Sequence, residues 1–72
     1  MSKADDMFEK LGYKKTERTY TIDYYKFEKR ITFEKTYKEI VVCDFYRVRD
    51  SITIQELQAI NQKCKELEWL DE

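Results

Sequence analysis

Apolar residues recur at helical spacing over residues 51–70, near the end of the chain. They follow one another at steps of three and four, with polar residues between them, as on a helix with one buried stripe. Thr53 and Glu56 have the spacing of a capping box at the helix start. Ile52 is placed to pack against Leu57 across that first turn. The pattern predicts a helix that closes the core with Leu57, Ile60, Cys64 and Leu67.

A shorter pattern of the same kind covers residues 2–11, with apolar positions Ala4, Met7, Phe8 and Leu11. Ser2 is suited to cap the first turn, and Gly12 can take the left-handed conformation that ends a helix. In such an ending the next residue folds back, so Tyr13 is expected to lie against Phe8. A helix this short is not stable alone in water, so we expect it to pack on an apolar surface.

Between the two helices, apolar and polar residues alternate with a period of two, which is typical of strands. The alternation predicts a first strand from residue 18 to residue 24, a second at residues 30–34 after a charged turn near Glu28 and Lys29, and a third at residues 40–46. Connections this short join antiparallel neighbours. We therefore expect an α+β fold with a short N-terminal helix, a three-stranded antiparallel β-meander and a longer C-terminal helix, both helices on one sheet face.

The third strand is apolar on both faces, so alternation alone does not say which face is buried. An even-numbered loop centred on Thr36 and Tyr37 would pair Phe33 with Ile40, Ile31 with Val42, and Lys29 with Asp44. A slip of one residue would reverse every assignment. In this register the predicted core consists of Met7, Phe8, Leu11, Tyr20, Ile22, Tyr24, Ile31, Phe33, Ile40, Val42, Leu57, Ile60, Cys64 and Leu67.

The same register leaves an apolar patch on the second face of the sheet, consisting of Tyr25, Val41, Cys43 and Phe45. A sheet face in contact with water normally carries less apolar area than this. We interpret the four residues as a candidate protein-contact surface.

The composition narrows the class of protein without identifying it. With 72 residues, the chain has room for a single domain, residues 1–72. Its 14 Lys and Arg residues and 15 Asp and Glu residues give a formal charge of −1, which lacks the basic excess of a phosphate-binding protein. The longest apolar run, residues 40–43, is too short for a signal peptide or a membrane span. We therefore expect a soluble cytoplasmic protein that does not bind membranes.

Residues that usually carry chemistry are scarce. The chain has no His, the commonest general base and metal ligand. Cys43 and Cys64 are 21 residues apart in unlike contexts, which predicts two buried, reduced thiols rather than a disulfide or a metal site. The single glycine, Gly12, leaves no phosphate-binding loop. We predict no catalytic, cofactor-binding or metal-binding residue, and we interpret Asp23, Glu28, Glu34 and Asp44 as solvated charges.

Both ends of the chain and a short middle stretch carry a family resemblance. The stretches are ADDMFEKLGY at residues 4–13, ITF at residues 31–33 and ITIQELQAINQKCKEL at residues 52–67. They resemble small uncharacterised proteins from phages and prophages of Gram-positive bacteria. The resemblance implies an accessory protein of a mobile element in the bacterial cytoplasm, and no activity that transfers to particular residues. That group is expected to have glycine at the position of Glu68, so either the helix continues through Trp69 or Glu68 accepts strain and Trp69 folds back.

Protein binding is the function that the sequence favours, with the second-face patch meeting either another copy of the chain or a host protein. Single-stranded nucleic-acid binding is the alternative, because Tyr25 and Phe45 could stack on bases. The basic neighbours for that role are Lys26, Arg30 and Arg47. The net charge argues against the nucleic-acid alternative, which makes a nucleic-acid partner the weaker expectation.

The sequence leaves two further alternatives, an enzyme and a solvated monomer. An enzyme is the least favoured class, and no small-molecule substrate or cofactor is indicated. The remaining alternative is a solvated monomer in which the loop around Tyr37, or the terminal Trp69, covers the patch.

Overall fold

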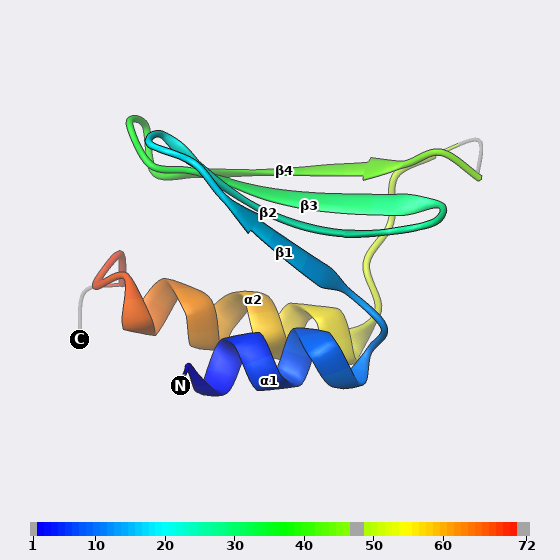
Figure 1. Ribbon diagram of the computed structural model, residues 1–72, viewed down its shortest axis with the longest axis horizontal. Helices are drawn as coiled ribbons and strands as arrows, with labels where there is room; N and C mark the ends of the chain where they lie inside the picture. The colour runs from blue at the N-terminus through cyan, green and yellow to red at the C-terminus, as the bar shows by residue number, and fades with distance from the viewer. Residues whose placement is uncertain (1, 47–48, 71–72) are drawn as a thin grey trace.

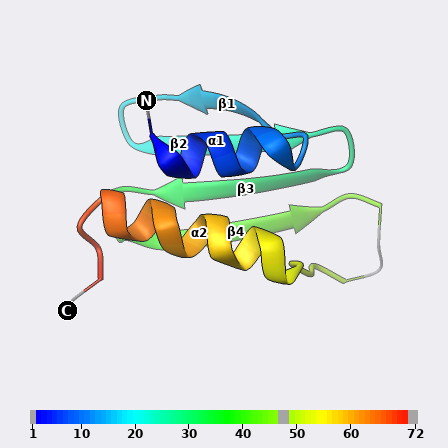
Figure 2. The same ribbon diagram turned by 90° about the horizontal axis from the view of Figure 1, so that it is seen from below.

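The computed structural model of the protein describes residues 2–46 and 49–70. In chain order the elements are α1 (Lys3–Lys10), β1 (Lys14–Glu17), β2 (Thr21–Lys26), β3 (Lys29–Glu34), β4 (Glu39–Asp44) and α2 (Ile54–Glu66). The strands form one antiparallel sheet in the order β1-β2-β3-β4, and both helices lie on the same face of it (Figure 1, Figure 2). The α+β class and the placement of both helices on one face are as predicted.

The described sheet has four strands, so the prediction of a three-stranded meander was wrong. The additional strand, β1, has the sequence Lys-Lys-Thr-Glu and contains no apolar residue, so it produces no alternating pattern. It is held by antiparallel pairing with β2, from Lys14 opposite Tyr25 to Glu17 opposite Ile22. A charged strand of this kind is suited to the edge of a sheet, where one side of its backbone faces water.

The predicted register between β3 and β4 is confirmed. The opposed residues are Phe33 and Ile40, Ile31 and Val42, and Lys29 and Asp44. The connection spans residues 35–38, and Lys38 closes it with a φ of 55°. The core-facing side of the sheet is therefore the side that carries Ile31 and Phe33, both fully buried.

Both ends of α1 are built as the sequence predicts. The Ser2 hydroxyl accepts a hydrogen bond from the Asp5 N–H at 3.1 Å, which caps the first turn. Gly12 has a φ of 93°, and the Tyr13 N–H donates to the Phe8 carbonyl at 3.0 Å. This is a Schellman ending, and it brings the Tyr13 ring to 5.7 Å from the Phe8 ring, edge to face.

The two ends of α2 follow the same rules. Thr53 and Glu56 form the predicted capping box. At the other end the helix does not continue through Trp69. Glu68 adopts a φ of 59°, and the Trp69 N–H donates back to the Cys64 carbonyl at 2.9 Å. Glu68 thus occupies the left-handed position that glycine normally fills, and Trp69 folds back onto Phe33 with 6.1 Å between ring centroids.

Glu68→Gly is expected to raise the free energy of unfolding by about 1 kcal/mol, because it removes the cost of a left-handed conformation at a residue with a Cβ atom. Thermal unfolding should show a midpoint higher by roughly 4–8 °C. Lys65→Gly is the matched control, since Lys65 is an exposed residue inside α2. That control should lower stability by about 1 kcal/mol. Equal losses for the two variants would mean that Glu68 continues the helix.

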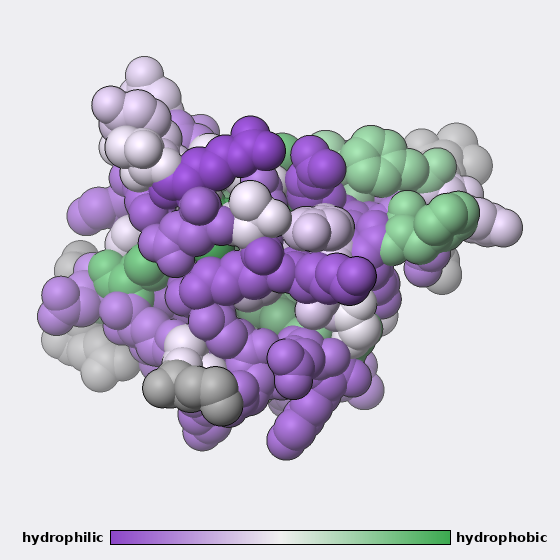
Figure 3. Space-filling view, in the orientation of Figure 1, coloured by the Kyte–Doolittle hydropathy of each residue, from purple (hydrophilic) through white to green (hydrophobic). Residues whose placement is uncertain are grey.

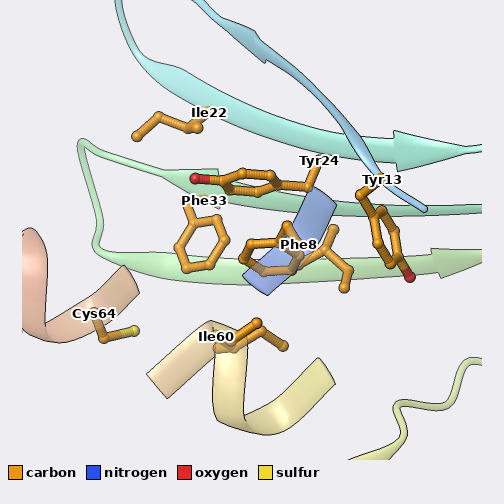
Figure 4. Packing of buried hydrophobic residues seen from close by; sticks show 9 residues of the cluster. Phe8, Tyr13, Ile22, Tyr24, Phe33, Ile60 and Cys64 are labelled. Atoms are coloured by element: carbon orange, nitrogen blue, oxygen red, sulfur yellow. The ribbon is translucent and has the colours of Figure 1, made fainter. Parts of the chain in front are cut away.

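The core lies between the sheet and the two helices, and aromatic rings dominate it (Figure 4). The Phe8 ring stacks on the Tyr24 ring at 3.9 Å, and the Phe33 ring meets both edge to face. Seven residues of the predicted core are buried: Phe8, Ile22, Tyr24, Ile31, Phe33, Ile60 and Cys64. Another four are partly buried against them: Met7, Leu11, Val42 and Leu67. Buried residues that the pattern missed include Ala4, Tyr13 and Ala59.

Three residues of the predicted core are exposed, so their assignment was wrong. Tyr20 is 67% exposed because it precedes β2, in the connection from β1. Ile40 is 37% exposed because β4 is an edge strand. Leu57 is 47% exposed because α2 is turned so that neighbouring positions face the sheet instead. The buried positions of α2 are Glu56, Ala59, Ile60, Lys63 and Cys64.

Candidate protein-contact surface

The face of the sheet opposite the helices has no layer over it in the described structure (Figure 1). Cross-strand pairing places Tyr25 on β2 opposite Arg30 on β3, and Arg30 opposite Cys43 on β4. Val41 lies two residues before Cys43, on the same face. Phe45 continues the alternation beyond β4, where its N–H donates to the Glu28 carbonyl at 2.7 Å. The predicted register therefore brings the four candidate residues to one face.

The four residues differ in exposure. Phe45 is 69% exposed and Val41 is 47% exposed, whereas Tyr25 and Cys43 are half-buried. The expectation that Cys43 is buried was therefore wrong, although Cys43 and Cys64 are both free thiols as predicted. Cys64 is buried, and burial raises the pKa of its thiol.

Two further aromatic residues are exposed at the end of the sheet where Phe45 lies, and the alternating pattern did not reveal either. Phe27 is 92% exposed at the tip of the two-residue turn between β2 and β3, and Tyr46 is 77% exposed just after β4. Figure 3 shows hydrophobic surface gathered at the end of the sheet where this turn and the end of β4 lie. An aromatic residue at the tip of a tight turn cannot reach the core, and that signal could have identified Phe27. We call the outer-face residues Tyr25, Val41, Cys43 and Phe45, together with Phe27 and Tyr46 at this end of the sheet, the outer-face patch.

Basic side chains flank one part of the outer-face patch. Lys14 and Arg30 lie on either side of Tyr25 in the same cross-strand row. A hollow of about 400 Å³ is lined by Gly12, Lys14, Tyr25, Lys26 and Phe27. The Lys26 ammonium group points toward the core side, 4.7 Å from the centre of the Tyr13 ring. Arg47, the third basic residue expected beside the patch, lies outside the described residues.

The segments that were considered as covers for the patch lie elsewhere. Trp69 packs on Phe33, which faces the helices, so it is on the opposite side of the sheet. Tyr37 is exposed in the loop between β3 and β4, at the other end of the sheet from Phe45 (Figure 1). Neither residue shields the patch in the described structure.

Of the four strand carboxylates expected to be solvated, Glu28 and Asp44 line one hollow of about 360 Å³ together with Phe27 and Tyr46. Asp23 accepts a hydrogen bond from the Thr32 hydroxyl at 2.7 Å, in the middle of the uncovered face. Asp44 accepts the Tyr46 N–H at 3.1 Å, and Glu34 accepts the Thr36 N–H. Within the described residues, no group of His, Cys, Asp or Glu side chains has the arrangement to hold a metal ion.

Glu56 forms a buried ionic cluster beneath the other face of the sheet. Its carboxylate accepts hydrogen bonds from Lys29 Nζ at 2.7 Å, the Tyr13 hydroxyl at 2.7 Å and the Thr53 N–H at 2.8 Å. Burial raises the pKa of Glu56, but these donors together outweigh it, so the pKa lies below its usual value. Burial and the bond to Glu56 raise the pKa of Tyr13. The carboxylate is therefore ionised, and it joins α2 to the sheet.

Asp5 forms a second cluster, at the interface between the helices and the sheet. Its carboxylate accepts hydrogen bonds from Lys15 Nζ at 2.8 Å and the Tyr24 hydroxyl at 2.6 Å, with Lys63 Nζ at 3.5 Å. Burial alone would raise the pKa of Asp5. The hydrogen bonds from Lys15 and Tyr24 and the charge of Lys63 lower it by more, so the pKa of Asp5 lies below its usual value. Glu66 of α2 similarly accepts the Ala4 N–H at 2.9 Å. These carboxylates already have several donors each, and they connect α1 to its neighbours.

Neither known protein families, nor curated proteins, nor solved structures yield a match to this chain. Among the described helices, none combines the length and the apolar character needed to cross a membrane. Function is therefore inferred from the surface and its side chains.

Proposed function

We propose that the protein acts by contact with another protein through the outer-face patch and catalyses no reaction. The observation that carries the proposal is the exposure of Phe27, Phe45 and Tyr46 at one end of the sheet, beside a face that none of the described helices covers. The centres of protein interfaces are enriched in aromatic residues and contain few charged residues. The resemblance to phage and prophage proteins suits an accessory protein that binds a host protein, or its own copy, in the bacterial cytoplasm.

Single-stranded nucleic-acid binding is a second candidate, favoured by one arrangement. Tyr25 lies between Lys14 and Arg30, so a base stacked on the ring would have a cation on each side for its phosphates. The formal charge of −1 and the acidic residues Glu34 and Glu39 at the far end of β3 and β4 oppose it. Binding of this kind would give an affinity for an oligonucleotide that falls steeply with salt.

Replacing Val41 with Lys and Phe45 with Glu in one variant is expected to abolish association while leaving the fold intact. Both side chains are exposed, so the new charges stay in water, whereas at an interface they would be buried without partners. Sedimentation of the pure protein reports self-association, and capture from a bacterial lysate reports host binding. The matched control places the same charges at Thr36 and Tyr37, which are exposed in the distant β3–β4 loop.

The outcomes separate the alternatives. A homodimer appears in the pure protein and is lost only in the Val41→Lys, Phe45→Glu variant. A host-directed protein stays monomeric and loses a captured protein only in that variant. Equal association of wild type and both variants would contradict a role for the patch, and unfolding of the patch variant would place Val41 and Phe45 in the core.

A further inference from the structure

β4 is the last strand of the sheet among the described residues, so one of its edges pairs with no strand. Two hydrogen bonds give the direction of its backbone groups. The Phe45 N–H donates toward β3, whereas the Asp44 N–H points the other way and donates to Asp50 Oδ1 at 3.0 Å. Because backbone groups alternate along a strand, the N–H and C=O groups of Ile40 and Val42 point to the open edge.

The two edges of the sheet differ in chemistry. β1 carries Lys14, Lys15 and Glu17, and charges on an edge strand discourage the addition of another strand. The middle of β4 is Ile-Val-Val-Cys, with no charge and no proline. Asp50 occupies the outward N–H at the end of β4 only. The open edge at Ile40 and Val42 is therefore the edge that can accept a strand.

Apolar side chains lie beside this edge on the helix side of the sheet. Ile40 and Val42 face that side, yet Ile40 is exposed and Val42 is only half-buried. Ile52, which precedes α2, and Ile54 and Leu57, in its first turn, are also exposed. A small hollow of about 180 Å³ lies here, lined by Val42, Asp50, Ser51 and Ile52. These side chains would be part of the core if one more strand were present.

The position of α2 limits what can occupy the edge. Figure 2 shows α2 crossing beneath β4, with its N-terminal half outside the line of that strand. Paired strands lie only about 4.8 Å apart, whereas packed helices need about 8–10 Å. A second copy joined through β4 would therefore bring its own α2 into space that this α2 occupies. A lone extended strand has no helix layer and meets no such obstacle.

We propose that the open edge of β4 binds one extended peptide segment of another protein by strand addition. The peptide exchanges backbone hydrogen bonds with Ile40 and Val42, and every second side chain points toward Ile54 and Leu57. The side chains at those alternate positions are apolar. This site lies at the edge and on the helix side of the sheet. Peptide binding there does not depend on whether the outer-face patch binds a protein.

The test is selection from a displayed library of peptides of about ten residues, a typical upper length for a strand. Val, Ile or Phe occupies every second position of the library, and the other positions are random. We expect binders whose addition slows hydrogen exchange at the Ile40 and Val42 amides. A selected peptide is then resynthesised with N-methyl groups on one edge or on the other. Methylation of the edge that faces β4 should abolish binding, and methylation of the other edge should leave it unchanged.

Two protein variants complete the test. Val42→Pro removes an outward N–H without removing a bond to β3, so the fold should persist and peptide binding should be lost. Leu57→Glu should weaken binding of the peptide by at least about tenfold, because a charge replaces the apolar contact. The Val41→Lys, Phe45→Glu variant should bind the peptide as wild type does, which separates this site from the outer-face patch.

Three results would overturn the proposal. The first is a selection against the folded protein that yields no binder. Selected peptides that tolerate Val42→Pro, or methylation of either edge, would bind elsewhere. A wild-type dimer that Val42→Pro converts to monomer would show that the edge receives a second copy of the chain.

Discussion

Glu56→Ala is expected to lower the free energy of unfolding by about 3–5 kcal/mol, because it leaves a buried ammonium group without its counter-ion. The Lys29 and Glu56 side chains are 7% and 4% exposed and lie 2.7 Å apart. The substitution also removes the acceptor for the Tyr13 hydroxyl and half of the capping box. The free energy of unfolding of a domain is only about 5–15 kcal/mol in total. Denaturant unfolding at neutral pH should therefore show that Glu56→Ala loses a large part of the stability.

Glu17→Ala is the matched control for this loss. Glu17 makes ion pairs with Lys15 and Lys35, but its side chain is 51% exposed, so removing it should cost less than about 1 kcal/mol. The pKa of Glu56 lies below its usual value, so its contribution is complete above about pH 4.3 and is lost as pH falls through the folded-state pKa. The difference between wild type and Glu56→Ala should therefore shrink in acid. Equal losses for the two variants at neutral pH would contradict the account.

Phe8→Ala is expected to cost about 3–5 kcal/mol, because Phe8 is the ring at the centre of the aromatic core. It is 1% exposed and contacts the rings of Tyr13, Tyr24 and Phe33. Its removal leaves a cavity between α1 and the sheet that these rings cannot fill without leaving their packed positions. Thermal or denaturant unfolding measures the loss.

Leu57→Ala is the informative comparison for Phe8→Ala. The helical stripe in the sequence predicts a loss of about 2–5 kcal/mol at this position, as for a buried leucine. In the structure Leu57 is 47% exposed, so the loss should be about 1 kcal/mol or less. A loss as large as that of Phe8→Ala would mean that α2 turns Leu57 toward the sheet.

The features that the sequence predicts correctly depend on local rules. The helix caps at Ser2 and Thr53 are set by residues within one turn. The glycine after α1 can adopt the left-handed conformation that ends the helix without the steric cost of a Cβ atom. The β3–β4 register follows from one loop length and the pairing of Phe33 with Ile40. Each of these signals lies within a few residues of the feature it determines.

The features that the sequence does not predict depend on contacts between distant segments. β1 has no apolar residue, and it is a strand only because β2 pairs with it. The stripe of α2 could face the sheet through Leu57 or through its neighbours. The burial of Glu56 and Lys63, which bind Lys29 and Asp5, favours the second arrangement. No periodic pattern of apolar residues reveals buried charges that find partners on other elements.

The candidate surface was predictable in part. Alternation and register were enough to place Tyr25, Val41 and Cys43 on one face, and Phe45 follows from the same alternation. Phe27 and Tyr46 were missed because they lie in turns, where alternation ends. The outer-face patch is thus larger and more aromatic than the pattern alone indicates.

Variant-dependent association is the most direct test of the proposed function. Wild type, the Val41→Lys, Phe45→Glu variant and the control with the same charges at Thr36 and Tyr37 are compared in one experiment. Each is first shown to be folded by its thermal midpoint, then examined by sedimentation and by capture from a lysate of a Gram-positive bacterium. We expect a self-associated species or a single captured protein with wild type and control, and neither with the patch variant. The same species or captured protein with all three would contradict it.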